Sequence, residues 1–450
     1  MPHWREGCHN LRTGTETGAS NLNGSRIPGI EGCKKPGKDE AINKNRVLLL
    51  YPAADVQQLT LIPLSLLHIA QPLLEEGIDV EIIDQRLEMD FFNRLQQRIQ
   101  SDLICIGISC ITGRPIQQAI RISEFIRERT SAPIVLGGTH ATLLPEQTLE
   151  SPLIDYIVIG KGEAPFLNLV KALKTNQSVT GLKQVGYKEN GKIIVNRGSV
   201  PEIKVNRIPY HILSRYARPS SVPIISSYGC PYNCSFCVEK VLHPKYHEIA
   251  ISDVMLMIQG ALELKPGFIN FIDDNFLVNR KRVIELFSLC RENNFNFQTV
   301  CTGRVDEVLS LDDDDVGFLR QRGLVGIFFG IESGSRKILK LVNKRITPDM
   351  VLKLNLRMKK EGIAPHYSFM AGFPTETKED REETVRLMDR LKQENPQAVV
   401  WKINNYTPYP GTELYDLAVQ YGFNPPRTFE EWSRVHFYSE DHGGGYDERL

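Results

Sequence analysis

The amino-acid sequence predicts an α/β protein with two domains, each built around a parallel β-sheet. Two observations carry this prediction. Short, continuously apolar runs alternate with amphipathic segments from Arg46 to about residue 175, and the same alternation resumes at Val222 and continues to residue 405. Strands that are apolar throughout and alternate with helices are typical of parallel sheets whose faces are covered by helices.

The first region has the pattern of a doubly wound, Rossmann-like sheet. We expect strands at residues 47–51, 80–83, 103–108, 134–136 and 156–159, and helices at 63–76, at 116–129 and after residue 163. Ligands of such sheets bind at the carboxyl ends of the strands. Two glycine-rich turns fall at that edge, namely Gly137-Gly138 and Gly160-Lys161-Gly162-Glu163.

The second region repeats the β/α alternation in six units, which predicts an open, partial (β/α)6 TIM-like barrel. We expect its strands at residues 222–227, 268–272, 297–301, 325–330, 366–371 and 399–405. The loop after the first of these strands lies at the carboxyl edge, where the chemistry of barrel enzymes gathers.

Composition divides the chain into five segments. They are a disordered arm (1–44), the first domain (45–175), a connector (176–221), the second domain (222–407) and a short C-terminal extension (408–450). The arm is polar and shows no periodicity, and we interpret its Cys8 and Cys33 as free thiols. The connector contains a hairpin at residues 185–195 with an Asn190-Gly191 turn, which we expect at the junction of the two domains.

The bulk composition is that of a globular protein in a reducing compartment. Among 450 residues, 41% are hydrophobic and 24% charged, and the formal net charge is zero, which gives no support for binding nucleic acid or an anionic membrane. No apolar run reaches the roughly 18 residues needed to span a bilayer. The N-terminus has no apolar signal core, so we expect a cytoplasmic protein. Nine cysteines, an odd number, argue for metal binding rather than disulfides.

Three of these cysteines form a C-x3-C-x2-C motif: Cys230, Cys234 and Cys237. Thiolates so close in sequence can converge on one metal centre, and thiolate is the ligand of iron–sulfur clusters. A four-iron cluster with three protein ligands keeps one iron open for a substrate or cofactor. Zinc is the alternative, with His243 or His247 as a fourth ligand.

This motif, with Phe236 before its last cysteine, resembles the radical S-adenosylmethionine (SAM) superfamily. Five further motifs at strand ends between residues 222 and 415 match the resemblance. They are Phe271-Ile272-Asp273-Asp274-Asn275-Phe276, Thr302-Gly303-Arg304-Val305-Asp306, Gly330-Ile331-Glu332-Ser333-Gly334, Gly372-Phe373-Pro374-Thr375-Glu376-Thr377 and Tyr409-Pro410-Gly411-Thr412.

The resemblance implies that the three cysteines hold a [4Fe-4S] cluster whose open iron chelates SAM. One electron, from a donor such as flavodoxin or ferredoxin, then cleaves SAM to methionine and a 5′-deoxyadenosyl radical. Phe236 is one implied SAM contact. Asp273 or Asp274 would accept from the SAM ammonium, and Arg304 would pair with the carboxylate. Glu332 and Ser333 would meet the ammonium or the ribose. For the acidic residues, helix capping or loop solvation is the alternative.

The first domain resembles the cobalamin-binding domain that precedes many radical SAM domains. The match rests on Gly137, Gly138, His140, Gly160, Gly162 and Glu163 and on the first helix, and spans about residues 46–175. The glycines would let the backbone approach the corrin and its nucleotide tail, and His140 would contact the tail or the corrin edge. A flavodoxin-like or dinucleotide-binding fold shares the alternation, but the first strand is not followed by G-x-G-x-x-G.

One departure concerns the cobalt. Cobalamin proteins with a histidine ligand carry D-x-H-x-x-G after the first strand, whereas the loop at residues 51–58 has no histidine. The resemblance therefore implies that histidine does not ligate the lower face of cobalt here. The loop at residues 109–112 is a candidate to face the corrin. Weak lower ligation would suit methyl transfer.

We therefore expect a cobalamin-dependent radical SAM enzyme that methylates an unactivated carbon, or a phosphorus, of a small-molecule metabolite. The alternative enzyme is an anaerobic oxidative cyclase that acts on a tetrapyrrole-like substrate. A non-catalytic cobalamin or iron–sulfur sensor is the alternative from another class, but no basic helix-turn-helix accompanies the two domains. The pattern assigns no catalytic side chain and no substrate.

Overall fold

The computed structural model describes residues 44–53, 62–213 and 219–435. The expected N-terminal arm with Cys8 and Cys33, most of the loop at residues 51–58, and the end of the C-terminal extension lie outside this part of the chain. The described residues belong to one unit, which contains both predicted sheets.

The first sheet has seven strands in the order β2-β1-β3-β4-β5-β6-β7. Strands β1 to β5 are parallel, as predicted. The strands are β1 (Arg46–Tyr51), β2 (Asp79–Asp84), β3 (Leu103–Ser109), β4 (Ile134–Gly137), β5 (Tyr156–Val158), β6 (Val185–Glu189) and β7 (Lys192–Asn196).

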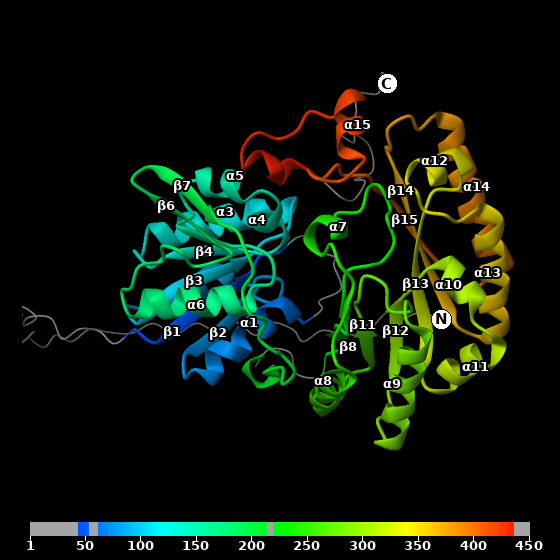
Figure 1. Ribbon diagram of the computed structural model, residues 1–450, viewed down its shortest axis with the longest axis horizontal. Helices are drawn as coiled ribbons and strands as arrows, with labels where there is room; N and C mark the ends of the chain where they lie inside the picture. The colour runs from blue at the N-terminus through cyan, green and yellow to red at the C-terminus, as the bar shows by residue number, and fades with distance from the viewer. Residues whose placement is uncertain (1–43, 54–61, 214–218, 436–450) are drawn as a thin grey trace, which may run out of the picture. The chain divides into compact units, whose positions relative to one another are not determined.

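Helices cover both faces of this sheet, which confirms the doubly wound fold (Figure 1). Val47 and Leu49 of β1 pack in one apolar core with α1 and α6, whereas Leu48 and Leu50 pack in a second core with α2 and α3. This alternation follows from the two-residue period of a strand. The helices are α1 (Leu64–Glu75), α2 (Phe91–Arg98), α3 (Arg114–Arg127), α4 (Thr139–Leu143), α5 (Pro145–Glu150) and α6 (Glu163–Lys174).

The hairpin of the expected connector belongs to the first sheet instead of a domain junction. Its first strand, β6, pairs antiparallel with β5, and Tyr187 lies opposite Tyr156. The inward-facing Val185 and Tyr187 are buried. The apolar side chains of the hairpin thus find their partners at the edge of the sheet that directly precedes it in the chain.

The second sheet has six parallel strands in the order β15-β14-β13-β12-β11-β8, which confirms the six predicted units. The strands are β8 (Ser221–Ile224), β11 (Phe268–Phe271), β12 (Gln298–Thr302), β13 (Leu324–Glu332), β14 (Ala364–Ala371) and β15 (Val399–Asn405). A separate antiparallel pair, β9 (Ser227–Tyr228) and β10 (His247–Glu248), stands beyond the end of β8.

Helices lie along one face of the second sheet, and α13 and α14 run beside β14 and β15 (Figure 1). The buried side chains Phe329, Tyr367 and Phe369 belong to the core on this face. The helices are α7 (Glu239–Leu242), α8 (Ile251–Glu263), α9 (Arg280–Glu292), α10 (Val305–Ser310), α11 (Asp313–Gln321), α12 (Arg336–Leu341), α13 (Pro348–Glu361), α14 (Lys378–Glu394) and α15 (Tyr415–Gln420). Within the described ranges, no helix combines the length and apolar character needed to cross a membrane.

Two segments outside the sheets join the domains. The 3-10 helix η1 (Tyr210–Ile212) contributes Tyr210 to the core shared by α1 and the second domain. After α15, the 3-10 helix η2 (Glu431–Arg434) places Trp432 in the core of the first domain. There the indole Nε1 of Trp432 donates to Oε1 of Gln147 (2.7 Å). The C-terminal extension therefore packs on the first domain.

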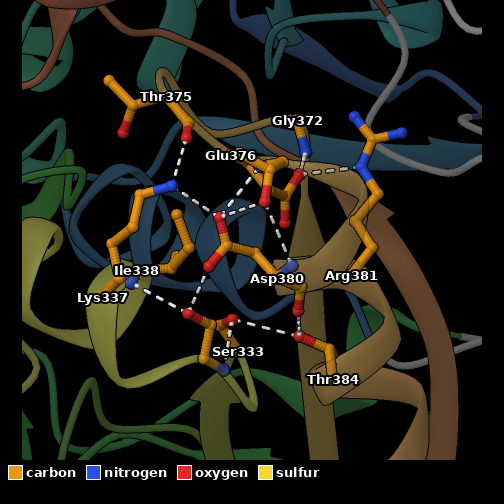
Figure 2. A network of polar contacts seen from close by, with 11 residues as sticks. Ser333, Lys337, Ile338, Gly372, Thr375, Glu376, Asp380, Arg381 and Thr384 are labelled. Carbon is orange, nitrogen blue, oxygen red and sulfur yellow. Dashed lines mark hydrogen bonds and ion pairs between the residues drawn. The ribbon is translucent and has the colours of Figure 1, made fainter.

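A buried polar network ties the ends of β13 and β14 to the start of α14 (Figure 2). Its centre is the carboxylate of Asp380, which accepts from Ser335 Oγ (2.6 Å), from Lys337 Nζ (2.7 Å) and from the backbone N–H of Thr377 (2.9 Å). Burial alone raises the pKa of Asp380, but these partners outweigh it and hold the pKa below its ordinary value. The charged form of this carboxylate therefore stabilises the fold.

We predict that Asp380→Asn lowers the free energy of unfolding at pH 7 by about 1–3 kcal/mol, because buried donors lose a charged acceptor. Lys337 is half exposed, so most of the loss comes from Ser335 and Thr377. Since the folded pKa lies below the unfolded value of about 3.9, the difference fades as the pH falls below 4. Urea unfolding followed by circular dichroism measures it.

The matched control is Glu382→Gln, which changes an exposed carboxylate in the first turns of the same helix. Its ion pair to Arg386 at 3.6 Å is exposed, so we expect a change below about 0.5 kcal/mol. Equal losses for the two variants would contradict the role given to Asp380.

Candidate functional site

The three cysteines of the C-x3-C-x2-C motif lie on a loop at the carboxyl edge of the second sheet, between β9 and α7. All three are free thiols and are partly exposed. The N–H of Cys237 donates to the carbonyl of Cys234 (3.0 Å), which folds the end of the motif back on itself. Three unpaired thiols on one loop are a donor set that fits an iron–sulfur cluster.

The neighbouring strands and helices fix this loop. The N–H of Ser235 donates to the carbonyl of Val342 (3.0 Å), and Asn343 Nδ2 donates to the carbonyl of Asn233 (2.6 Å). The loop begins at Gly229, where φ is +72° and a Cβ would lie 2.8 Å from a backbone oxygen. Only glycine meets both conditions without strain.

Burial makes Cys230 and Cys237 weaker acids than an exposed thiol. It raises the pKa of Cys237 to about 12 and also raises that of Cys230. In the absence of a metal, these two side chains are therefore neutral thiols at pH 7. A cluster would have to displace their protons as it binds.

Arg304 brings a positive charge next to the thiols. Its Nη1 lies 3.9 Å from Sγ of Cys234, and its guanidinium stacks over the ring of Tyr232 at 3.8 Å. Asp306 (3.0 Å) and the carbonyl of Lys344 (2.7 Å) hold its other nitrogens. The side chain is thus oriented by its neighbours while one nitrogen faces the cysteine loop.

Lys344 and Glu332 form a buried ion pair beside the same loop. Lys344 Nζ lies 2.8 Å from Oε1 of Glu332, and the two side chains are 12% and 7% exposed. Burial lowers the pKa of Lys344, but the charges of Glu332 and Cys234 raise it by more, so it remains an ammonium. The ammonium also lies 5.9 Å from the ring centre of Phe236, which packs against Phe373.

Glu332 is also strained. It ends β13 with φ at +72°, a conformation that costs a non-glycine residue about 1–3 kcal/mol. Such strain persists where surrounding contacts enforce it and is frequent at functional sites. Ser333, the next residue, is fully buried, and its hydroxyl is engaged by Thr384 (3.0 Å) and by the N–H of Ser335 (3.1 Å). Glu332 thus borders the site, whereas the place of Ser333 does not support its predicted ligand contact.

The two aspartates that follow β11 have different surroundings. Asp273 is fully buried, and its carboxylate accepts from Ser226 Oγ (2.7 Å) and Ser227 Oγ (2.6 Å), which joins the ends of two strands. Asp274 is exposed to the site and accepts from the N–H of Gly229 (2.8 Å). Although part of the residue reaches solvent, desolvation of its carboxylate by the surrounding protein, together with the charge of Glu239, raises the pKa of Asp274 to about 6. Of the pair, Asp274 is therefore the one available to a ligand.

The glycine-rich turns of the first sheet line one cavity of about 270 Å³ at the carboxyl ends of β3, β4 and β5. A Cβ on Gly138 would lie 2.6 Å from a backbone oxygen, and φ there is +98°. Predicted residues in the lining are Gly137, Gly138, Gly160, Gly162 and Glu163. The opposite wall comes from the second domain and includes Ile225, Tyr228 and Ile272, which flank the cysteine loop.

His140 does not line this cavity. Its ring is fully buried, is held at Nδ1 by Thr112 Oγ1 (3.0 Å), and contacts the rings of Phe429 and Trp432 at 5.4 and 5.9 Å. The predicted contact of His140 with cobalamin is therefore not supported, because the C-terminal extension covers the ring. In the loop at residues 109–112, Ser109 lines the cavity and Ile111 is 45% exposed.

Sequence reasoning missed Lys344 and His68. Lys344 follows α12 in a polar loop where a lysine is ordinary, and only the fold brings it to Glu332. His68 lies within the apolar pattern of α1, yet its ring faces Glu163 across the cavity wall. A histidine on an otherwise apolar helix face was the one signal available for it. Cys105, Cys290 and Cys301 are buried, as expected for small apolar residues.

We predict that protein stability falls as the pH drops through the range in which His140 resists protonation. Burial lowers the pKa of His140 to about 4, whereas an unfolded histidine titrates near 6.5. Between these values the unfolded chain binds a proton that the folded one excludes, so acidification from pH 6.5 to 4 costs up to about 3 kcal/mol. Urea unfolding of wild type and His140→Phe over this range measures the difference.

The variant should lose part of this pH dependence, while His211→Phe, at an exposed site on η1, should keep it. Identical pH profiles for wild type and His140→Phe would show that the ring is not excluded from protonation.

Comparison with known proteins identifies both domains. The B12 binding domain family matches residues 53–170, and the radical SAM superfamily matches residues 224–388. An uncharacterized methyltransferase from Pyrococcus horikoshii is 30% identical over 371 residues, which are 79% of this chain and 78% of that protein. The anaerobic magnesium-protoporphyrin IX monomethyl ester cyclase of Rubrivivax gelatinosus is 26% identical, and the match covers 69% of this chain but 57% of the cyclase.

Among solved structures, the radical SAM methyltransferase TsrM from Kitasatospora setae, with cobalamin and a [4Fe-4S] cluster bound, matches with a TM-score of 0.70. The match covers 83% of this chain and 74% of TsrM at 17% identity, which shows a shared fold. The cofactors of the family are a [4Fe-4S] cluster, SAM and cobalamin, and the cysteine loop and the glycine-lined cavity fit them. The chain therefore belongs to the radical SAM enzymes that carry an N-terminal B12-binding domain.

Proposed function

We propose that this protein is a cobalamin-dependent methyltransferase that acts on an unactivated carbon, or a phosphorus, of a small-molecule metabolite. One observation carries the proposal. The glycine-lined cavity of the B12-binding domain is also lined by Ile225, Tyr228 and Ile272 of the second domain, which come directly before the cysteine loop or at the end of the neighbouring strand β11. A substrate between the two sites would be in reach of both cofactors.

When bound, the cluster with SAM supplies a 5′-deoxyadenosyl radical, and cobalamin supplies a methyl group. Cys230, Cys234 and Cys237 would hold the cluster. Arg304 would pair with the SAM carboxylate, and its Nη1 at 3.9 Å from Sγ of Cys234 supports this role. Asp274 and Glu332 offer carboxylates to the ammonium. Phe236 packs against Phe373 and gives this edge of the site an apolar wall.

At the other site, Gly137, Gly138, Gly160 and Gly162 would let the backbone approach the nucleotide tail and the corrin. Ser109 and Ile111 are placed toward the same edge of the sheet. The loop that we expect to leave the cobalt without a histidine ligand lies partly outside the described residues.

Relatives support methyl transfer and keep one alternative open. The relative from P. horikoshii is named a methyltransferase, and a bacteriochlorophyllide d C-8(2)-methyltransferase from Chlorobaculum tepidum is 26% identical over 71% of its length. The named cyclases also match, and their name favours oxidative cyclisation of a tetrapyrrole-like substrate as the second candidate. An electron donor such as flavodoxin or ferredoxin and a cytoplasmic location complete the proposal. We place the domain boundaries at residues 45–196 and 222–407, because β6 and β7 belong to the first sheet.

Methyl transfer predicts label in the product when the anaerobically reconstituted protein acts on a substrate in the presence of methyl-labelled SAM. Mass spectrometry of a cell extract incubated with this enzyme, SAM and a reductant would detect the labelled metabolite. A product that is oxidised or cyclised and carries no label would reject methylation in favour of the cyclase alternative.

The two cofactor sites should fail independently. Cys234→Ser removes one of the three thiols that would hold the cluster. We expect this variant to form 5′-deoxyadenosine at least about 100-fold more slowly than wild type but to bind cobalamin with unchanged affinity. Gly138→Val places a branched side chain where φ is +98°, so we expect the reverse outcome.

Iron and sulfide content, 5′-deoxyadenosine yield and the cobalamin absorption spectrum give three separate readouts. Retained cobalamin binding in Gly138→Val, with the same affinity as wild type, would show that the cavity is not the cobalamin site.

A further inference from the structure

His68 and Glu163 form a polar pair in a cavity that is otherwise largely apolar. His68 comes from α1 and Glu163 from the start of α6, and Nδ1 lies 3.4 Å from Oε1. The side chains are 7% and 15% exposed. Leu49, Val135 and Phe166 are among the apolar side chains of the same lining. The pair thus places two ionisable side chains in a lining that is mostly apolar.

Glu163 determines which nitrogen of His68 carries a proton. Burial raises the pKa of Glu163, but the hydrogen bond from His68 and the other favourable contacts of the carboxylate lower the pKa by more. The ionised carboxylate can only accept, so Nδ1 of His68 must donate. In the neutral ring, Nε2 then carries the lone pair and is an acceptor.

The acceptor Nε2 has no protein partner. It is buried from solvent and makes no hydrogen bond within the described residues, although His68 lines the cavity. A buried polar atom without a partner costs about 1–3 kcal/mol, so such atoms normally mark a place where water or a ligand completes the bonding. We therefore expect Nε2 to accept a hydrogen bond from a molecule bound in the cavity.

We propose that His68 recognises the nucleotide of cobalamin by accepting, at Nε2, a hydrogen bond from a ribose hydroxyl, and that Glu163 is its positioning residue. The inference rests on the cobalamin site of the proposed function. It adds a residue that binds the nucleotide of cobalamin and so distinguishes it from a corrin without one. A flat apolar base fits a cavity of about 270 Å³ with walls such as Val135 and Phe166. The hydroxyls of the ribose are the donors that the nucleotide itself offers.

The test compares hydroxocobalamin with cobinamide, which has the same corrin but lacks the nucleotide. Binding of each to the full-length protein is measured by equilibrium dialysis, with cobinamide up to millimolar concentration. The variants are His68→Phe, which keeps a ring but removes the acceptor, and Glu163→Leu, which removes the acceptor that holds the proton on Nδ1. His211→Phe, on η1 and outside the cavity lining, is the matched control.

We expect both variants to bind hydroxocobalamin about tenfold more weakly than wild type, while cobinamide binding changes by less than about twofold. The control should leave both affinities unchanged. Equal losses for the two ligands would overturn the proposal, because they would show a general effect on packing. Unchanged hydroxocobalamin binding in both variants would overturn it as well. If wild type bound neither ligand, the cobalamin site itself would be refuted, which is a separate outcome.

Discussion

The site depends on one constraint: three thiols must be presented on one partly exposed loop, although burial favours the neutral form of Cys230 and Cys237. Backbone conformation and hydrogen bonds hold the loop in place. Gly229 turns the chain after β9, and hydrogen bonds from Ser235 and to Asn233 fasten the loop to the segment after α12. Arg304 and Lys344 then bring positive charge to the side of Cys234, which favours thiolates once a metal arrives. The ligands are thus prepared before the cluster binds.

Around this loop the polar groups fall into two kinds. Asp273, Ser333 and Asp380 are fully occupied by donors or acceptors of the protein, and they join strand ends to one another or to α14. Asp274 and the Glu332–Lys344 pair lie at the border of the site, where a ligand can exchange partners with them. The first group makes the edge of the sheet rigid, and the second remains available to chemistry.

The sequence allowed both sheets to be predicted, because apolar runs such as Val47–Leu50 have no other stable place than a buried parallel strand. The cysteine motif was equally readable, since its ligands are neighbours in the chain. Contacts between segments that are distant in the sequence could not be predicted in this way. Phe429 and Trp432 pack against His140 although almost 300 residues separate them in the sequence. No local sequence pattern predicts this contact. Likewise, the partnership of His68 with Glu163 arises only where α1 meets α6.

We propose that the cluster and cobalamin face one shared cleft. Electron paramagnetic resonance of the anaerobic protein, with the cluster reduced and cobalamin in its paramagnetic cobalt(II) form, tests it directly. A shared cleft predicts that the spectrum of the doubly loaded protein is broadened or split by spin–spin interaction, compared with the protein that holds either cofactor alone. A spectrum equal to the sum of the two single spectra would contradict the claim.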